Sequence, residues 1–260
     1  MITAGIDCGA KNTKAVILRD QEVIGQDLVR TGFDQEKSAA ESLEKAIKAA
    51  GIARDEIQRI CSTGSGKKAV KFADDDVDDI TAMSRGAIFF FPDARTVVDV
   101  GAEEGRAAKI DEKGNPVDSE INDKCAAGAG AFIEAMSRAL GVSIEAMGPL
   151  ALQSDQKIPI NAQCVVFAES EVVGLIHTKT ARQDISRAIH DAMAGRIVSL
   201  VRRIGINQDV AMVGGVGYNP GIRAAMLHEL KVENLYVPAD PEFGSAVGAA
   251  VVAAEKAECQ

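Results

Sequence analysis

The sequence contains two cysteines that each stand directly before a stretch with helical periodicity. Cys125 precedes a run of small residues, after which Phe132, Met136 and Leu140 recur every four positions, as on an amphipathic helix. Cys164 opens a second such stretch. The free N–H groups and the dipole at a helix N-terminus favour a thiolate. Two thiolates are too few for a four-thiolate iron–sulfur cluster, but two such surfaces meeting across a two-fold axis would supply four.

The cysteine pattern as a whole suggests neither a disulfide framework nor a zinc site. The chain has five cysteines, an odd number, and none of them forms a Cys-x-x-Cys pair. We expect Cys8, Cys61 and Cys259 to be small buried hydrophobic residues. For Cys125 and Cys164, placement at a helix start leaves that interpretation open as well.

A further candidate for chemistry is an Asp-x-Gly sequence at the end of an apolar strand near the N-terminus. Residues 2–9 read as a strand that ends at Asp7 and Gly9, and residues 13–18 read as the returning strand. In such a hairpin the glycine lets backbone N–H groups approach phosphate oxygens, and the carboxylate can hold a hydrated magnesium ion. An ordinary turn uses the same residues, so one copy alone favours a turn.

The same pattern recurs at Asp99 and Gly101, again between an apolar strand and a returning strand, 106–110. A repeat on one strand–turn–strand scaffold predicts a duplicated domain whose two hairpins face each other across a cleft. Neither copy has the spacing of a Walker P-loop or of a Gly-x-Gly-x-x-Gly dinucleotide fold. The two aspartates are therefore the candidate carboxylates of a hairpin-type phosphate site.

Helices and strands are expected to position these residues in an α/β fold. Between the hairpins the sequence predicts a helix closed by Gly51 and then a strand. After the second hairpin it predicts a buried strand that runs into Gly214, Gly215 and Gly217. The expected helices span 38–50, 143–152, 184–204, 220–230 and a small-residue stretch near the C-terminus; the expected strands include a short one around 23–24 and others at 57–61, 209–213 and 235–238.

Three features receive the plainer interpretation. The acidic run 74–79 lacks EF-hand spacing, so we expect a solvated turn or a helix start. Residues 63–68 are rich in glycine and lysine; a phosphate loop is the alternative to the favoured simple loop. His177, His190 and His228 form no recognisable triad or zinc pattern and are expected to be structural.

The composition of the chain limits the classes of partner that it can have. The 260 residues carry a formal net charge of −9, which argues against nucleic acid as a partner. No apolar run reaches the length of a membrane span and no targeting segment is recognisable. We expect a cytoplasmic protein that binds neither nucleic acid nor membrane.

The two Asp-x-Gly hairpins, the glycine-rich strand end at 214–217 and the small-residue C-terminal helix resemble the ATPase superfamily of actin, sugar kinases and heat-shock chaperones. The segments around Cys125 and Cys164 resemble, within it, the BadF/BadG/BcrA/BcrD ATPases. The resemblance covers nearly the whole chain. It implies an α/β, duplicated ATPase fold with two subdomains around a nucleotide cleft. Residues 1–93 would carry the first phosphate hairpin, and residues 94–260 the second hairpin, the cluster cysteines and the adenosine loop.

The resemblance also implies roles for individual residues. Asp7 and Asp99 would be catalytic and would hold magnesium through water. Cys125 and Cys164 would be the two ligands that each subunit gives to one bridging [4Fe–4S] cluster. The expected ATP-binding residues are, in the two phosphate loops and the adenosine loop, Gly9, Ala10, Lys11, Asn12, Lys14, Gly101, Ala102, Gly214, Gly215 and Gly217.

The function that the resemblance implies is ATP-driven transfer of electrons from a ferredoxin-type donor to a partner that reduces a thioester. After Asp99 this chain carries Gly101-Ala102-Glu103-Glu104-Gly105-Arg106, where the dehydratase activators carry Gly-Gly-Gln-Asp. This resembles the BcrD/BadG/BzdQ-like ATPase subunit of benzoyl-CoA reductase. We therefore expect a reductase subunit that pairs with a homologous sister ATPase subunit, or with a second copy of itself, and serves catalytic iron–sulfur subunits.

Three alternatives remain. The nearest is a homodimeric activator of a 2-hydroxyacyl-CoA dehydratase. A small-molecule kinase of the same superfamily would leave the two cysteines unexplained. A non-enzymatic scaffold would bind ATP without turnover.

Overall fold

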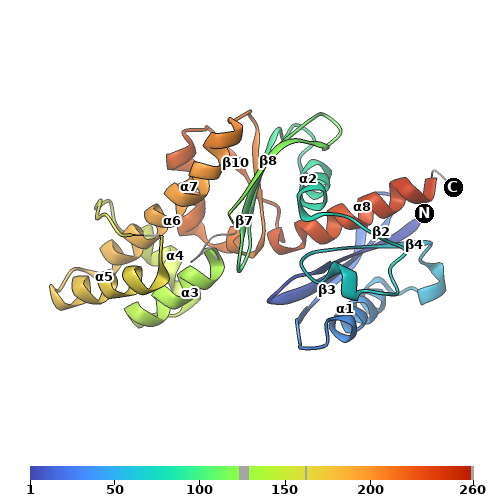
Figure 1. Ribbon diagram of the computed structural model, residues 1–260, viewed down its shortest axis with the longest axis horizontal. Coiled ribbons are helices and arrows are strands. Elements are labelled where there is room, and N and C mark those ends of the chain that lie inside the picture. The colour runs from blue at the N-terminus through green and yellow to red at the C-terminus, as the bar shows by residue number, and fades with distance from the viewer. Residues whose placement is uncertain (123–128, 162, 259–260) are drawn as a thin grey trace.

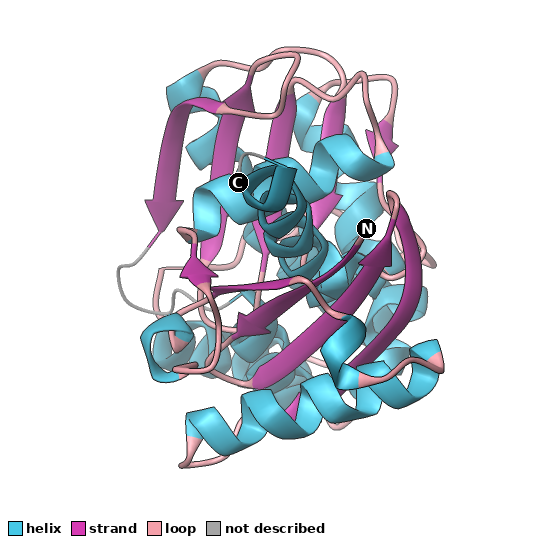
Figure 2. Ribbon diagram, turned by 90° about the vertical axis from the view of Figure 1, so that its right-hand side faces the viewer, coloured by secondary structure: helices cyan, strands magenta, loops and turns pink. Residues whose placement is uncertain are grey.

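The computed structural model describes residues 1–122, 129–161 and 163–258. Its strands form two five-stranded sheets, with orders β3-β2-β1-β4-β5 and β10-β9-β6-β7-β8. Figure 2 shows the two sheets as separate layers, with the C-terminal helix between them in that view. The strands are β1 Ile2–Cys8, β2 Asn12–Arg19, β3 Glu22–Arg30, β4 Arg59–Thr63, β5 Asp75–Asp76, β6 Thr96–Val100, β7 Gly105–Ile110, β8 Pro116–Asn122, β9 Val210–Val213 and β10 Leu235–Tyr236.

The two sheets repeat one topology. In the first, β1, β2 and β3 form an antiparallel meander, and β1 pairs in parallel with β4, which pairs in parallel with β5. In the second, β6, β7 and β8 form the meander, and β6 pairs in parallel with β9, which pairs in parallel with β10. The prediction of an α/β fold built from two duplicated halves is confirmed.

Apart from α2, which no periodicity predicted, the helices lie near the positions expected from the sequence, with ends that follow their caps. Helix α1 begins one turn early, because the carboxylate of Asp34 accepts a hydrogen bond from the amide of Lys37, and it ends at Gly51, whose φ is 66°. The helices are α1 Gln35–Ala50, α2 Asp79–Phe90, α3 Ala129–Leu140, α4 Ile144–Ala151, α5 Val165–His177, α6 Arg182–Ile204, α7 Pro220–Leu230 and α8 Gly244–Glu258, with 3₁₀ turns at Arg54–Glu56, Lys67–Ala69, Gly215–Tyr218 and Pro241–Phe243.

Some boundaries differ from expectation. Strand β3 extends from Glu22 to Arg30 instead of ending near residue 24, because it pairs with β2 along its whole length. The acidic run does begin a helix: Asp78 caps α2 through the amide of Thr81. The same run also supplies β5, and Asp75 is not simply solvated, since it forms ion pairs with Arg59 and Lys256.

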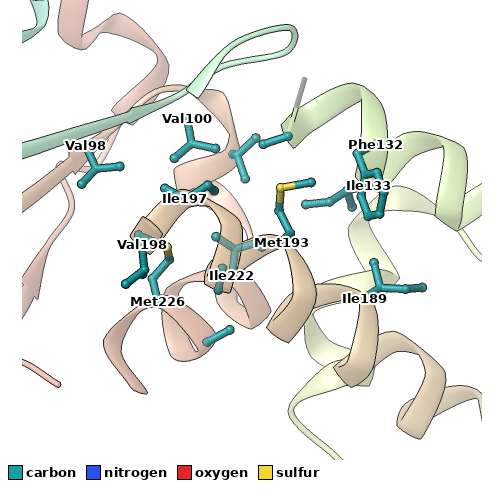
Figure 3. Packing of buried hydrophobic residues seen from close by; sticks show 14 of the residues in the cluster. Val98, Val100, Phe132, Ile133, Ile189, Met193, Ile197, Val198, Ile222 and Met226 are labelled. Carbon is teal, nitrogen blue, oxygen red and sulfur yellow. The ribbon is translucent and has the colours of Figure 1, made fainter. Parts of the chain in front are cut away.

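The largest hydrophobic cluster lies beside the second sheet. Val98 and Val100 of β6 face Met193 and Ile197 of α6, and Phe132 and Ile133 of α3 close the other side (Figure 3). All of these side chains are buried. Helix α6 is thus the central helix of this half, and α3, which packs against both α6 and α5, rests on a close-packed core.

Helices α2 and α8 join the halves. In Figure 1, α8 runs from the middle of the molecule to the side that carries the first sheet, where both termini lie. It packs on β1, β2 and β4 of that sheet and along α2. Glycines allow this close approach, because a Cβ at Gly86 would overlap the carbonyl of Gly244, and one at Gly248 the carbonyl of Ala82. The division of the chain at residue 93 remains a prediction.

Among the described residues, no helix combines the length and the apolar character needed to cross a membrane.

The α2–α8 contact predicts a strong size limit at Gly248. Gly248→Ala should lower the free energy of unfolding by about 2–3 kcal/mol, because the added methyl meets backbone of α2 and neither helix has room to yield. Gly195→Ala in α6 is the matched control: apart from its chain neighbours and the backbone of its own helix, no described residue comes within 4 Å of its Cβ position. That variant should be stabilised by up to about 1 kcal/mol. Urea unfolding of both variants measures the difference, and equal stabilities would contradict this account of the packing.

Candidate functional site

The two hairpins open onto one cavity of about 510 Å³. Both aspartates line it, together with residues from α3, α4 and the loops after β4 and β9. Of the predicted nucleotide-binding residues, nine line the cavity: Gly9, Ala10, Lys11, Asn12, Lys14, Gly101, Ala102, Gly214 and Gly215. Gly217 is not among its lining residues; it is packed against Pro241 behind the loop.

The carboxylate of Asp7 is held from two sides. Lys14, its direct partner across the β1–β2 ladder, places Nζ 2.8 Å from Oδ2. On the other side, Gly64 at the end of β4 has a φ of +88°, and a Cβ there would lie 2.5 Å from Oδ1 of Asp7. Burial opposes the charged form of Lys14, but the carboxylate of Asp7 outweighs it and raises the lysine pKa. The lysine thus stays charged at the cavity wall.

The carboxylate of Asp99 is held in the same way. Arg106 is its direct partner across the β6–β7 ladder, with Nη1 2.9 Å from Oδ2. Gly214, at the end of β9, has a φ of +90°, and a Cβ there would collide with Oδ1 of Asp99. The duplication therefore extends to a matched unit of carboxylate, cross-strand cation and left-handed glycine.

Arg106 has two further partners. Its Nη2 lies 2.7 Å from the carboxylate of Glu104 and 3.1 Å from that of Asp79, which begins α2. Burial opposes the charge on the guanidinium, but the carboxylates of Asp99, Asp79 and Glu104 together raise its pKa. Burial also raises the pKa of Asp79, an effect that Arg106 partly offsets. This network links the second hairpin to the helix between the halves.

The cavity is strongly acidic. Among its described lining residues are eight acidic side chains and three basic ones, Lys11, Lys14 and Arg106. A nucleoside triphosphate would meet net repulsion here unless a divalent cation accompanied it. No three His, Cys, Asp or Glu side chains in the described ranges are grouped to hold a metal ion by themselves. A magnesium ion beside Asp7 and Asp99 would thus take most of its ligands from water and phosphate.

One part of the cavity wall is apolar. Ile133, Ile144, Val216 and Pro220 line it beside Gly214 and Gly215. A flat heteroaromatic base can bury its faces against such a wall while the phosphates lie toward the aspartates. The cavity therefore has the two chemical surfaces that a nucleotide needs.

Helix α3 is attached to both phosphate hairpins. The amides of Gly130 and Ala131, in its first turn, donate hydrogen bonds of 3.1 and 3.0 Å to the carbonyls of Gly101 and Ala102. These amides have no partner within the helix, so the second hairpin caps it. Further along, Glu134 forms an ion pair with Lys11 of the first hairpin. Both hairpins are therefore in direct contact with this helix.

The two candidate cluster ligands differ in what the structure shows. Cys125 lies outside the described residues. Cys164 is partly exposed and is the N-cap residue of α5, as its sequence position predicts. Only Ala168 and Val172 of α5 are buried, whereas Val166, Phe167, Val173 and Ile176 are exposed. A thiol at a helix start beside an exposed apolar face is suited to a metal cluster at a subunit interface.

Four residues of the site escape the sequence-based prediction. The sequence favours a simple loop at Gly64. However, Gly64 follows β4 as Gly214 follows β9, so knowledge of the strand order would have revealed the role of Gly64. Arg106 follows Asp99 by seven positions, as Lys14 follows Asp7, so the spacing does carry a signal for it. Asp79 and Glu134 reach the cavity from helices, and no local pattern indicates this.

The architecture belongs to the ATPase class of actin, sugar kinases and heat-shock chaperones. A ROK-family glucokinase from Streptomyces griseus, solved with glucose and AMPPNP, matches with a TM-score of 0.63 at 12% identity, over 98% of this chain and 100% of that one. At this identity the match shows the fold alone.

Within this class, residues 4–253 match the BadF/BadG/BcrA/BcrD ATPase family. The chain belongs to that family, as its sequence resemblance indicates.

Three relatives illustrate the family. Component A of (R)-2-hydroxyglutaryl-CoA dehydratase from Acidaminococcus fermentans has a TM-score of 0.94 at 32% identity, over 99% of both chains. The activator of 2-hydroxyisocaproyl-CoA dehydratase from Clostridium difficile, solved with ADPNP, has a TM-score of 0.91 at 34% identity, over 99% of this chain and 96% of that one. A benzoyl-CoA reductase subunit from Thauera aromatica is 30% identical, over 96% of this chain and 92% of its own.

The fit of Gly64 against Asp7 predicts a functional effect. Gly64→Ala should lower the ATP turnover rate at least tenfold, because the new methyl displaces the carboxylate and strains a left-handed backbone. Gly51→Ala is the control: its φ is also positive, but apart from its chain neighbours no described residue comes within 4 Å of its Cβ position. It should cost about 1–2 kcal/mol of stability and leave turnover unchanged. Steady-state ATPase assays with thermal melting separate the two effects, and equal turnover in both variants would contradict the prediction.

Proposed function

We propose that this protein is an ATP-hydrolysing activator that delivers low-potential electrons to a partner enzyme acting on a 2-hydroxyacyl-CoA thioester. The observation that carries the proposal is the attachment of α3 to both phosphate hairpins. In the sequence, Cys125 precedes Gly130 of this helix by five residues. The nucleotide site and the candidate cluster ligand are therefore neighbours along a short stretch of chain.

In this proposal Asp7 and Asp99 orient the magnesium-bound water and the phosphates. Lys14 holds Asp7 and Arg106 holds Asp99 in place, so neither carboxylate has to reorganise during the reaction. The backbone of residues 9–12 and 101–102 faces the phosphates, and the loop at Gly214 and Gly215 receives the adenosine. ATP fits this cavity in its chemistry, with an acidic end for the magnesium complex and an apolar end for the base.

The proposed electron site is formed by Cys125 and Cys164 of each of two subunits. A [4Fe–4S] cluster bound there would supply one-electron transfer. Cys164 supports this role because it is accessible at the start of α5 and the neighbouring apolar side chains lack a cover within the described chain. A second copy of the same surface would complete the ligand set and bury that face.

The coupling between the two sites follows from the contacts of α3. A triphosphate at the first hairpin competes with Glu134 for Lys11, and events at the second hairpin act on the helix-capping carbonyls of Gly101 and Ala102. Each state of the nucleotide therefore favours a different set of restraints on α3, which is the requirement for coupling between two sites. The donor would be a ferredoxin-type protein.

The second candidate is the ATPase subunit of a benzoyl-CoA reductase with a sister subunit. The sequence Gly101-Ala102-Glu103-Glu104-Gly105-Arg106 favours it. The relatives described above support the activator better, because the two dehydratase components have the higher identities, 32% and 34% against 30%. Our sequence-based preference for the reductase subunit is therefore replaced by the alternative.

Anaerobic purification tests the proposal. The wild-type protein should be brown, contain about four iron and four sulfide per two chains, hydrolyse Mg·ATP and sediment as a homodimer. Cys164→Ala should lose the iron and keep Mg·ATP binding. Cys61→Ala is the matched control, since Cys61 is buried in the core and burial raises its pKa to about 12; it should keep its iron.

Three results would count against this function. A colourless wild-type protein under anoxic handling would exclude the electron-transfer role. Iron retained in Cys164→Ala would exclude the proposed ligand. A stable complex with a different ATPase subunit, in place of a homodimer, would favour the reductase.

The ion pair across the cavity gives a separate prediction. Glu134→Gln should bind Mg·ATP up to about fivefold more tightly, because Lys11 becomes free for the phosphates and a partly exposed ion pair contributes no more than about 1 kcal/mol. Glu145→Gln removes the same charge from the cavity wall, where Glu145 has no ion-pair partner among the described residues. Calorimetric titration of both variants isolates the contribution of the pair. Equal affinities would show that only the overall charge matters.

A further inference from the structure

The two cross-strand cations occupy equivalent positions but have unequal surroundings. Lys14 is paired with one carboxylate, Asp7. Arg106 is shared among three, at distances of 2.9 Å to Asp99, 2.7 Å to Glu104 and 3.1 Å to Asp79. The first unit therefore pairs one cation with one carboxyl group, whereas the second surrounds one cation with three carboxyl groups. The second hairpin holds excess negative charge at the place where a phosphate has to approach.

The contacts of Arg106 are also incomplete. Its two terminal nitrogens bind the three carboxylates, but its Nε is buried without a hydrogen-bond partner in the described part of the chain. A guanidinium has five N–H donors in a planar fork. In Arg106 only the two terminal nitrogens, Nη1 and Nη2, have partners among the described residues. Its side chain is 15% exposed and lines the cavity. It is thus a charged group held by the protein and accessible to a ligand in the cavity.

Glu104 is the partner most easily exchanged. It belongs to the loop of the second hairpin and its side chain is 41% exposed, so water already solvates it. Asp79 is more buried, and burial favours its neutral form. Phosphate oxygens in the cavity compete with both carboxylates, and a planar fork binds two such oxygens at once, which a lysine ammonium does not.

We propose that Arg106 is a catalytic residue that turns from Glu104 and Asp79 to the terminal phosphate of ATP and stabilises the charge on the transferred phosphoryl group. This inference rests on the ATP hydrolysis proposed above. In that reaction the oxygen of water bonds to the γ-phosphorus while the bond from this phosphorus to the β–γ bridging oxygen breaks. The electron pair of that bond stays on ADP, one proton of the water passes to bulk solvent, and Arg106 remains protonated throughout.

Asp99 keeps a different role. Its Oδ1 is confined by Gly214 and its Oδ2 by Nη1 of Arg106, so it holds one terminal nitrogen of the arginine while the other, Nη2, changes partners. The network of Glu104 and Asp79 then has a function in the empty cleft, because it keeps the guanidinium charged and in position until a phosphate arrives. Glu103 lies in this same loop, next to Glu104.

The test uses two variants in the full-length protein. Arg106→Gln removes the charge, and Arg106→Lys keeps the charge but loses the fork. Arg203→Gln is the matched control, because Arg203 is 61% exposed and pairs with Glu120 of β8, away from the cavity lining. Each protein is assayed for kcat and KM with Mg·ATP, for calorimetric binding of Mg·ADP, for inhibition by Mg·ADP with vanadate, and for melting temperature.

If the inference holds, Arg106→Gln lowers kcat by about 10²–10³ and weakens vanadate inhibition by a comparable factor. Its Mg·ADP affinity stays within about twofold of wild type, because ADP lacks the group that Arg106 contacts. Arg106→Lys recovers part of kcat, and Arg203→Gln matches the wild type.

Other results overturn it. A kcat within about threefold of wild type in both Arg106 variants excludes a catalytic role. Equal losses for Mg·ATP, Mg·ADP and vanadate, together with a lower melting temperature, assign Arg106 to the scaffold. If Arg106→Gln does not fold, Arg106→Lys decides between these outcomes with the same assays. A wild-type protein without ATP hydrolysis overturns the proposed function itself, and this inference with it.

Discussion

The structure depends on how a carboxylate is held at the end of a buried strand. At each of two equivalent strand ends, a cation across the antiparallel ladder and a left-handed glycine after the parallel neighbour confine one aspartate between them. Asp7 and Asp99 are 9% and 6% exposed, and ion pairing offsets the cost of burying a carboxylate. Because the backbone sets both partners, the acid is oriented before any ligand binds, which is the condition for electrostatic preorganisation.

The duplicated halves form the cleft, and differences between the two copies make its two sides unequal. The first unit pairs its aspartate with a lysine alone, while the second surrounds an arginine with two extra carboxylates. The helix after the second hairpin is capped by that hairpin's own carbonyls and reaches the first hairpin through Glu134. In a symmetric site the two hairpins would make equivalent contacts, and no single helix would be restrained more than its counterpart. The proposed effect of the nucleotide on α3 depends on this asymmetry.

The halves are joined by two helices whose contact leaves little freedom. Glycines let α2 and α8 approach so closely that their backbones touch, and α8 packs on the first sheet although it ends the chain (Figure 1). Asp79 begins α2 and binds Arg106, so the N-terminus of this joining helix lies at the site. Motion between the halves would thus alter the contacts of Arg106. A change in the contacts of Arg106 would in turn act on the N-terminus of α2.

The sequence by itself determined the repeat, because an apolar strand ending in Asp-x-Gly is a local pattern that survives in both copies, and it determined most helices through their periodicity. It also identified eleven of the residues that line the cavity, Asp7 and Asp99 among them. Tertiary structure alone decided the rest: that Gly64 confines Asp7, that Asp79 and Glu134 reach the cavity from helices, and that α8 returns to the first sheet. These contacts join residues far apart in the chain through strand order and close packing, and no local spacing encodes such a pairing.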